Sequence, residues 1–208
     1  MKIVPNVRYT FTMPSRLVDE DDLLDRLTDV FRTVGFDGAS LNDLSVASGL
    51  QKSSLYHRFP GGKVQMATEV VERLGNEAVK RALAPLKAEG PMKTRIEQVG
   101  LALAAFYEAG TKSCLLDTMS IGSVGRNSDV ALAAAANRWI DAFARVAASS
   151  GVKPSVARAR AQDAVAAIEG ALVLGRVTND RRPFARAIER LPTVLLGDSD
   201  HQKCSKEK

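Results

Sequence analysis

Cysteine and histidine are scarce in this sequence of 208 residues, which contains two of each. Cys114, Cys204, His57 and His201 are scattered and show none of the paired spacings of a zinc site. In a reducing compartment, two free thiols are the ordinary state. The sequence therefore predicts no disulfide framework, no metal site and no cofactor.

Long apolar runs are missing as well. The opening residues, MKIVPNVRYTFTMPSR, contain no apolar stretch long enough for a signal peptide. Nothing further along approaches the roughly 20 uninterrupted apolar residues of a membrane helix. We expect no membrane partner and a protein that stays in the cytoplasm.

The apolar residues lack both the alternation typical of strands and any internal repeat. With 45% apolar and 25% charged residues, the chain has the composition of an ordinary globular protein. Helical periodicity interrupted by glycine and proline predicts an all-α fold of about nine helices. After the first three, helices are expected at residues 63–84, 92–109, 115–121, 129–149, 155–177 and 183–196.

The segment 23–66 stands apart because the third of its three helical patterns is too polar to be core. A first helix opens at the acidic run Asp19–Asp22 and ends at Gly35, after which Phe36 folds back onto it. Its expected apolar face consists of Leu23, Leu24, Leu27, Val30, Phe31 and Val34. Ser40 is a suitable N-cap for a short second helix, whose inward positions are Leu41, Leu44 and Ala47.

Ser48-Gly49-Leu50 is expected to form a tight turn, because glycine adopts the positive φ that a sharp helix connection requires. The next helix, residues 51–58, packs through Leu55 and presents polar side chains on its other side. Such a pair of helices is typical of a helix-turn-helix, whose second helix enters the major groove of DNA, although many αα-corners share this spacing. Charge supports this only locally: residues 1–66 contain eight basic and eight acidic residues, but residues 44–63 contain three cations and no acid.

The run GFDGASLNDLSVASGLQKSSLYHRFPGGK resembles the DNA-binding region of TetR-type bacterial transcriptional regulators, most specifically in LYHRF followed by a turn and Lys63. The segments FPGGK, Cys114-Leu115-Leu116 and EGALVL at 169–174 resemble the LmrA/YxaF-like branch. The resemblance implies an N-terminal arm and helix-turn-helix domain at residues 1–62. A helical ligand-binding and dimerisation domain at 63–197 and a disordered tail at 198–208 would follow.

The resemblance also implies which residues meet double-stranded DNA. They are Ser40, Asn42, Gln51, Lys52, Ser53, Ser54, Tyr56, His57 and Lys63. The first three residues of the third helix would reach base edges, with Lys52 addressing guanine and Gln51 adenine. The other six would contact the phosphate backbone, Lys63 with support from the N-terminus of its own helix.

Plainer alternatives exist for several of these residues. Tyr56 and His57 can be ordinary surface residues, and Ser40 can serve as an N-cap, as a phosphate ligand or as both. Arg58 can face solvent or form an ion pair within the chain.

Two features depart from the family pattern. The acidic run Asp19–Asp22 lies where the family often has basic or neutral residues near DNA, and an arm with Arg8 and Arg16 would have to compensate. Ser45 replaces the alanine expected at the helix crossing.

In the family, the later helices hold a small-molecule pocket and the dimer interface. The candidate pocket lining is Phe106, Tyr107, Cys114, Leu116, Met119, Trp139 and Phe143, although the same residues can form ordinary core. No basic neighbour is evident that would make Cys114 a redox sensor. The homodimer is expected through the last two long helices, with packing inside the chain as the alternative. Their stripes are Ala164, Ala167, Ile168, Ala171, Leu172 and Gly175, and Ile188, Leu191, Val194 and Leu195.

These expectations describe a homodimeric, nucleoid-associated regulator on a near-palindromic operator. Its expected action is that of a repressor released by a small, planar aromatic inducer. The alternative is an architectural or cell-division DNA-binding protein without an inducer, which an interior lacking a ligand-sized cavity would favour. An enzyme with catalytic residues is not expected, because no motif supplies a nucleophile with a base, paired carboxylates or a metal cluster.

Overall fold

The computed structural model of the chain describes residues 19–121 and 126–197, and every regular element in this part is a helix. The all-α prediction is confirmed. The α-helices are α1 (Glu20–Gly38), α2 (Leu41–Ser48), α3 (Lys52–Arg58), α4 (Gly62–Ala82), α5 (Met92–Phe106), α6 (Leu115–Met119), α7 (Arg126–Ala148), α8 (Pro154–Thr178) and α9 (Arg182–Leu196). Two short 3₁₀ helices, η1 (Ala84–Lys87) and η2 (Glu108–Gly110), flank α5. None of the described helices is long and apolar enough to cross a bilayer.

The expected N-terminal arm with Arg8 and Arg16 lies outside the described residues, as does the tail from residue 198 that holds Cys204.

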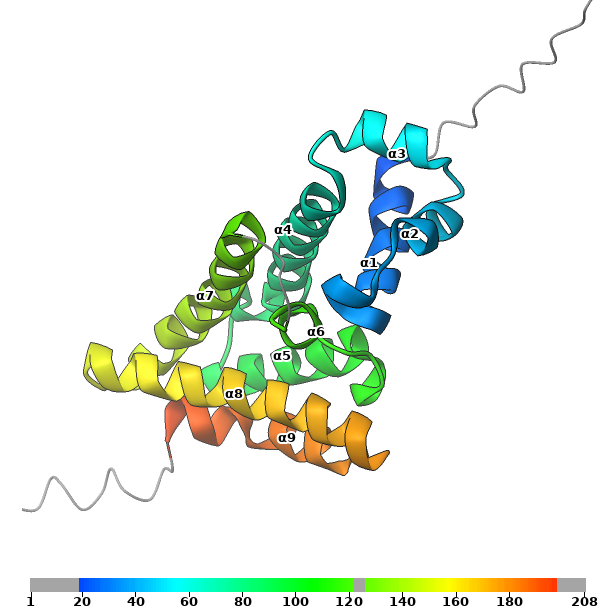
Figure 1. Cartoon of the computed structure of the whole chain (residues 1–208). Coiled ribbons are helices and arrows are strands. Elements are labelled where there is room, and N and C mark those ends of the chain that lie inside the picture. Colours follow the sequence, from blue (N-terminus) through cyan, green and yellow to red (C-terminus); the bar gives the residue numbers. More distant parts are fainter. Residues whose placement is uncertain (1–18, 122–125, 198–208) are drawn as a thin grey trace, which may run out of the picture.

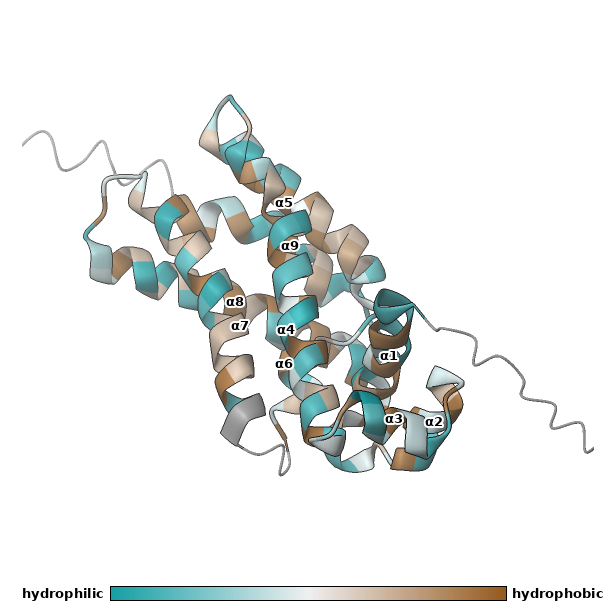
Figure 2. Cartoon of the chain, turned by 90° about the horizontal axis from the view of Figure 1, so that it is seen from above, coloured by the Kyte–Doolittle hydropathy of each residue, from teal (hydrophilic) through white to brown (hydrophobic). Residues whose placement is uncertain are grey.

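The helices form two groups that α4 connects (Figure 1). Helices α1, α2 and α3 gather at one end of the molecule, and α8 and α9 lie side by side at the other. Apolar and polar bands alternate along most of these helices, as expected when each buries one side (Figure 2). One buried cluster unites α1–α3 and the first half of α4 with side chains of α6 and the start of α7. A second unites the end of α4 with α5, α7, α8 and α9.

Helix α1 is kinked where the sequence predicted its end. Gly35 has φ 69°, but the helix resumes for one further turn to Gly38. The kink places Phe36 against Phe31, with stacked rings 6.4 Å apart, as the predicted fold-back requires. Val34 is consequently left at the surface, 49% exposed, so its assignment to the apolar face was wrong.

Helix α4 also begins with an exposed apolar residue, Val64. Met66 and Ala67 occupy the buried positions in its first turns.

The stripes expected to form the dimer surface lie mostly inside the chain's own core. Only Ala167 among them is exposed. The fully buried members are Ala164, Ile168, Ala171, Leu172, Leu191 and Leu195. The alternative of packing within the chain is therefore correct for these residues, because α7, α8 and α9 pack closely together. The outer face of α8 carries different apolar residues, Leu174 and Val177, which are 53% and 75% exposed.

Candidate nucleic-acid interface and effector pocket

Local hydrogen bonds stabilise α2 and the turn between α2 and α3. Ser40 and Asp43 form a reciprocal capping box at the start of α2, and these bonds lower the pKa of the Asp43 carboxyl. Gly49 then adopts φ 70° in the turn, as predicted. The Ser45 hydroxyl donates to the carbonyl of Leu50 at 2.6 Å, so the serine that replaces the expected alanine fastens the turn.

Helix α3 packs on one side only. Leu55 is fully buried against the same cluster as Leu44, whereas Tyr56 is 47% exposed. All six residues predicted for DNA contact from this segment are exposed: Gln51, Lys52, Ser53, Ser54, Tyr56 and His57. Gln51 is the N-cap and makes no capping bond with its side chain, which leaves its amide available to a ligand. Polar donors are thus presented on one face of a helix held at a fixed angle.

Two of the other predicted phosphate contacts already have partners in the chain. The Lys63 ammonium donates to the carbonyl oxygens of Phe36 and Ala39 at 2.9 and 3.0 Å and lies 4.3 Å from the centroid of the Phe36 ring. It therefore supports the end of α1 and has one N–H left of its three. The Ser40 hydroxyl is 2.6 Å from an Asp43 carboxylate oxygen. Asn42 is exposed on α2.

The acidic run at the start of α1 is paired with arginines of the chain. Glu20 lies 3.1 Å from Arg58, which gives Arg58 the ion pair that was one of its two alternatives. Asp22 pairs with Arg26 at 2.6 Å. Asp21 pairs with Arg73 of α4 at 3.2 Å, which reduces the repulsion that the run would exert on a phosphate backbone.

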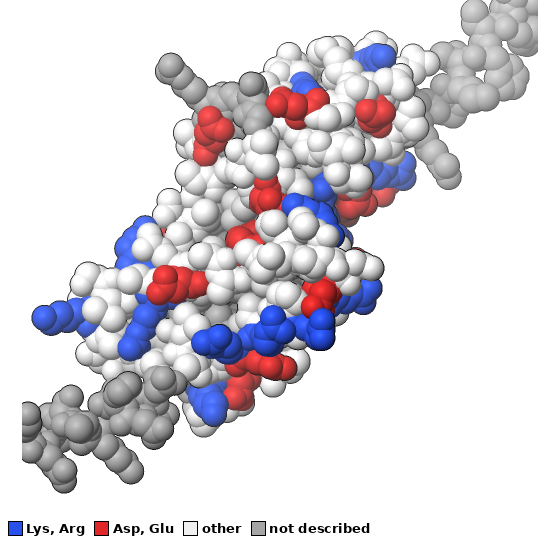
Figure 3. All heavy atoms as spheres, turned by 60° about the horizontal axis from the view of Figure 1, so that its bottom comes forward, with Lys and Arg blue, Asp and Glu red and all other residues white. Residues whose placement is uncertain are grey.

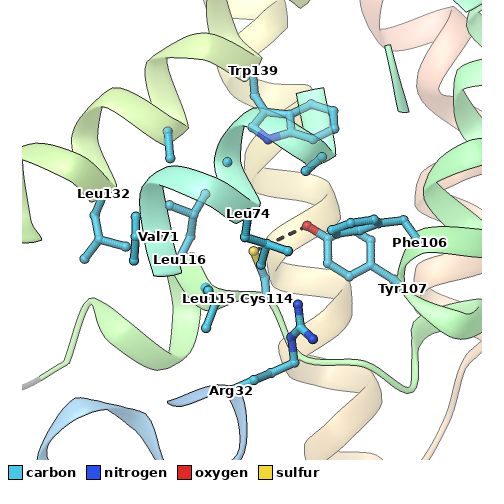
Figure 4. A pocket seen from close by; sticks show the side chains of 13 residues that line it. Arg32, Val71, Leu74, Phe106, Tyr107, Cys114, Leu115, Leu116, Leu132 and Trp139 are labelled. Atoms are coloured by element: carbon cyan, nitrogen blue, oxygen red, sulfur yellow. Dashed lines mark hydrogen bonds between the residues drawn. The ribbon is translucent and has the colours of Figure 1, made fainter. Parts of the chain in front are cut away.

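A cavity of about 40 Å³ lies where α1, α4, α6 and α7 meet (Figure 4). Five of the seven residues predicted for a ligand pocket line it: Phe106, Tyr107, Cys114, Leu116 and Trp139. Met119 does not line it and is instead fully buried in the cluster that unites α1, α2 and α3. Phe143 faces a separate, smaller space of about 10 Å³ beside Glu169. The wall also includes side chains of α1 and α4 that the sequence did not single out, among them Arg32, Val71 and Leu74.

Two protonatable groups, Tyr107 and Cys114, line this cavity, and a third, Glu169, lines the neighbouring smaller space. The Tyr107 hydroxyl donates to the Cys114 sulfur at 3.4 Å. Burial raises the pKa of the Cys114 thiol to about 12, and that of the Glu169 carboxyl to about 7. A thiol with such a high pKa is a poor nucleophile, which argues against redox sensing by Cys114.

Arg32 is the functional candidate that sequence reasoning missed. Only 8% of it is exposed, and its side chain points from α1 toward Tyr107 and Cys114 (Figure 4). A usable signal exists, because Leu24, Thr28 and Arg32 recur at intervals of four and all three are buried. Among the described residues, no group of His, Cys, Asp and Glu is arranged to hold a metal ion.

Comparisons with known proteins agree with this arrangement. Residues 23–70 match the model of bacterial regulatory proteins of the tetR family, and residues 93–190 match the C-terminal domain of LmrA/YxaF-like transcriptional regulators. An uncharacterized HTH-type transcriptional regulator of Mycobacterium tuberculosis is 28% identical over 180 residues, covering 81% of this chain and 90% of the relative. YxaF of Bacillus subtilis, also an HTH-type regulator, is 25% identical over 192 residues, covering 88% and 98%.

Solved structures show the same fold. A TetR transcriptional regulator from Legionella pneumophila superposes with a TM-score of 0.75 at 15% identity, covering 86% of this chain and 99% of the other. The reduced form of NemR from E. coli superposes with a TM-score of 0.69 at 19% identity, covering 86% and 97%.

Proposed function

Since this chain belongs to the TetR family of bacterial regulatory proteins, with an LmrA/YxaF-like C-terminal domain, it is a DNA-binding transcriptional regulator, and we propose that it is a ligand-responsive repressor. A homodimer would set two α3 helices in successive major grooves of a near-palindromic operator, about 34–36 Å apart. A small molecule bound in the cavity would favour the conformation that does not fit DNA and so release the operator. The protein would act in the cytoplasm.

The observation that carries this proposal is the composition of the cavity wall. Arg32 comes from α1, Leu74 from α4 and Leu115 and Leu116 from α6. Helices α1 and α4 hold the DNA-contacting segment, so a change in this wall reaches α3 through only a few packed side chains. At about 40 Å³ the cavity is far below the roughly 300–1,000 Å³ of a typical ligand site, so a ligand must push the wall apart.

Helix α6 provides a route for that displacement. Its Thr118 carbonyl lies against the kink of α1, where a Cβ added to Gly35 would be 2.7 Å from the oxygen. On its other side, Asp117 pairs with Arg176 of α8 at 2.6 Å. A ligand that moves Leu115 or Leu116 therefore acts on α1 and α8 together.

The proposed dimer surface is the outer face of α8 with α9. Leu174 and Val177 are exposed there, and Figure 3 shows uncharged areas on this side of the molecule beside a row of Lys and Arg side chains. Exposed apolar residues on α8, with α9 packed beside it, suit a contact to which each of two copies contributes two helices.

The experiment is footprinting on DNA that flanks the protein's own gene, with and without a panel of planar aromatic compounds. Protection of a near-palindromic site that disappears with one of these compounds is the expected result. Protection that no compound affects would support a second candidate, an architectural DNA-binding protein without an inducer, which the small cavity favours. The family and the relatives are regulators rather than enzymes, and sustained turnover of a substrate by the purified protein would contradict both candidates.

A further inference from the structure

The Arg32 guanidinium is buried without a full set of partners. Its Nε has no hydrogen-bond partner among the described residues. The one acidic group paired with it is Asp29, whose carboxylate is 3.6 Å from a terminal nitrogen and whose side chain is 74% exposed. A buried cation with an unused donor is costly, and in native proteins such a group calls for an explanation.

The surroundings of Arg32 are otherwise apolar or neutral. Leu74, Leu115, Phe106 and Trp139 supply most of the wall around it. Tyr107 and Cys114 are the polar groups that line the cavity with Arg32, and burial raises the pKa of both, so both carry their protons at neutral pH. The cavity thus offers one positive charge at one end and an apolar, partly aromatic body.

We propose that this cavity takes a small apolar carboxylic acid, whose carboxylate pairs with Arg32 and whose hydrocarbon body lies against Trp139 and Phe106. The proposal rests on the ligand-responsive function proposed above and names the ligand's chemical class. A guanidinium binds a carboxylate through two parallel N–H bonds, which a neutral amide cannot reproduce. One buried cation also matches a single negative charge.

One partly buried acid would oppose such a ligand. Glu169 adjoins Cys114 and Tyr107, and one of its carboxylate oxygens lacks a hydrogen-bond partner. Its pKa of about 7 means that it takes up a proton readily, which removes the repulsion when a second carboxylate arrives.

The position of Arg32 makes the ligand's charge a signal to the DNA-binding helices. Arg32 lies three residues before the Gly35 kink and on the same helix as Leu27 and Phe31, which pack beneath α2 and α3. A carboxylate that draws Arg32 into the cavity therefore acts on α1 directly.

Trp139 allows a direct test, because it is the chain's single tryptophan and lines the cavity. Cyclohexanecarboxylate, phenylacetate and 3-phenylpropanoate would be titrated into the full-length protein alongside their neutral amides, with Trp139 fluorescence as the readout. We expect at least one acid to bind about tenfold or more tightly than its amide, as a charge-assisted bidentate pair should. Acids that bind no better than their amides, or do not bind at all, would overturn the proposal.

The variant Arg32→Met tests the residue itself. It should abolish the preference for acid over amide, whereas Arg26→Met, which alters an exposed arginine of the same helix away from the cavity, should retain it. Circular dichroism melting checks that both variants fold. If Arg32→Met fails to fold, the comparison of acids with amides on the wild-type protein still tests the proposal. A preference that survives in folded Arg32→Met assigns the charge recognition elsewhere and refutes the proposal.

The same samples separate this inference from the proposed function. Fluorescence anisotropy of a labelled operator measures DNA affinity with and without each compound. Acids that bind through Arg32 but leave DNA affinity unchanged would uphold the inference and contradict the inducer mechanism. Release of DNA by neutral compounds alone, with no binding of acids, would uphold the repressor and refute this inference.

Discussion

Protonatable side chains that are shielded from solvent make the stability of this protein depend on pH. Glu169 is the clearest case, because burial raises the pKa of its carboxyl from 4.5 to about 7. The folded state therefore holds a proton that the unfolded chain releases between these values, and stability falls as pH rises through that window. The contribution is fully favourable below pH 4.5 and fully lost above pH 7.

Replacing Glu169 with glutamine should remove this pH dependence. Between pH 5 and pH 8, the wild type should lose roughly 2 kcal/mol of unfolding free energy more than Glu169→Gln does. Urea unfolding of both proteins at the two pH values measures this difference. The exposed Glu97→Gln is the matched control and should follow the wild type, and a parallel response of Glu169→Gln would disprove the assignment.

Lys52 is the residue on which base recognition by α3 depends in our proposal. Lys52→Ala should cost about 1–3 kcal/mol of binding free energy on the operator and relax the preference at one position. Anisotropy titrations on the operator and on single-base variants, at two salt concentrations, measure both effects. Lys93→Ala, an exposed lysine on α5, should leave affinity and preference intact. If Lys52→Ala bound the operator with unchanged affinity and preference, other residues would have to recognise the bases.

At the scale of elements, a few neighbouring residues define where each helix begins and ends. Contacts with other parts of the chain decide how the helix bends. Gly35 ends the helical pattern in the sequence, yet α1 continues beyond it because Phe36 gains a buried site against Phe31. The bend also admits the Thr118 carbonyl of α6 close to the Gly35 backbone. Glycine is required here both for its positive φ and for the missing Cβ.

Gly35→Ala should therefore be costly, by about 2–4 kcal/mol, since conformational strain is added to a close contact with backbone. Gly90→Ala is a matched control, because Gly90 also has positive φ, 110°, but nothing lies within 4 Å of an added Cβ. Its cost should be near 1 kcal/mol. If urea unfolding showed the same loss of unfolding free energy for Gly35→Ala and Gly90→Ala, the Thr118 carbonyl of α6 would not lie in close contact with Gly35.

The whole molecule combines the helix-turn-helix at one end, a cavity between the helix groups and exposed apolar residues on α8. The cavity wall and the α6 contacts link the first two, and the Arg176–Asp117 pair links α6 to α8. In the proposed dimer, the contact between the two copies would set the spacing of their α3 helices, so operator affinity would depend on a surface far from the DNA.

Leu174→Asp on the outer face of α8 should dissociate the proposed dimer and lower operator affinity by about tenfold or more, because two half-sites no longer bind together. Sedimentation velocity and anisotropy measure the two effects. Leu101→Asp places the same charge at a leucine of α5 that is 62% exposed, against 53% for Leu174, and should leave a dimer. A dimeric Leu174→Asp would assign the interface to another surface.

The sequence by itself determined the helices and the helix-turn-helix. The Ser40 cap, the glycine at position 49 and the buried pair Leu44 and Leu55 act over a few residues, and all appear in the structure where they were expected. These signals are local because capping bonds and backbone dihedrals involve near neighbours in the chain.

Only the tertiary structure decided what each apolar or charged face meets. Ile168 and Leu172 had the pattern of an interface but lie in the chain's own core, and Phe143 faces away from the cavity that Trp139 lines. Arg32 continues the spacing of Leu24 and Thr28 on α1, but only the packing of the other helices places it in the wall of a cavity. An amphipathic pattern predicts that one face of a helix is buried. The element that covers this face depends on long-range packing, which no local sequence signal encodes.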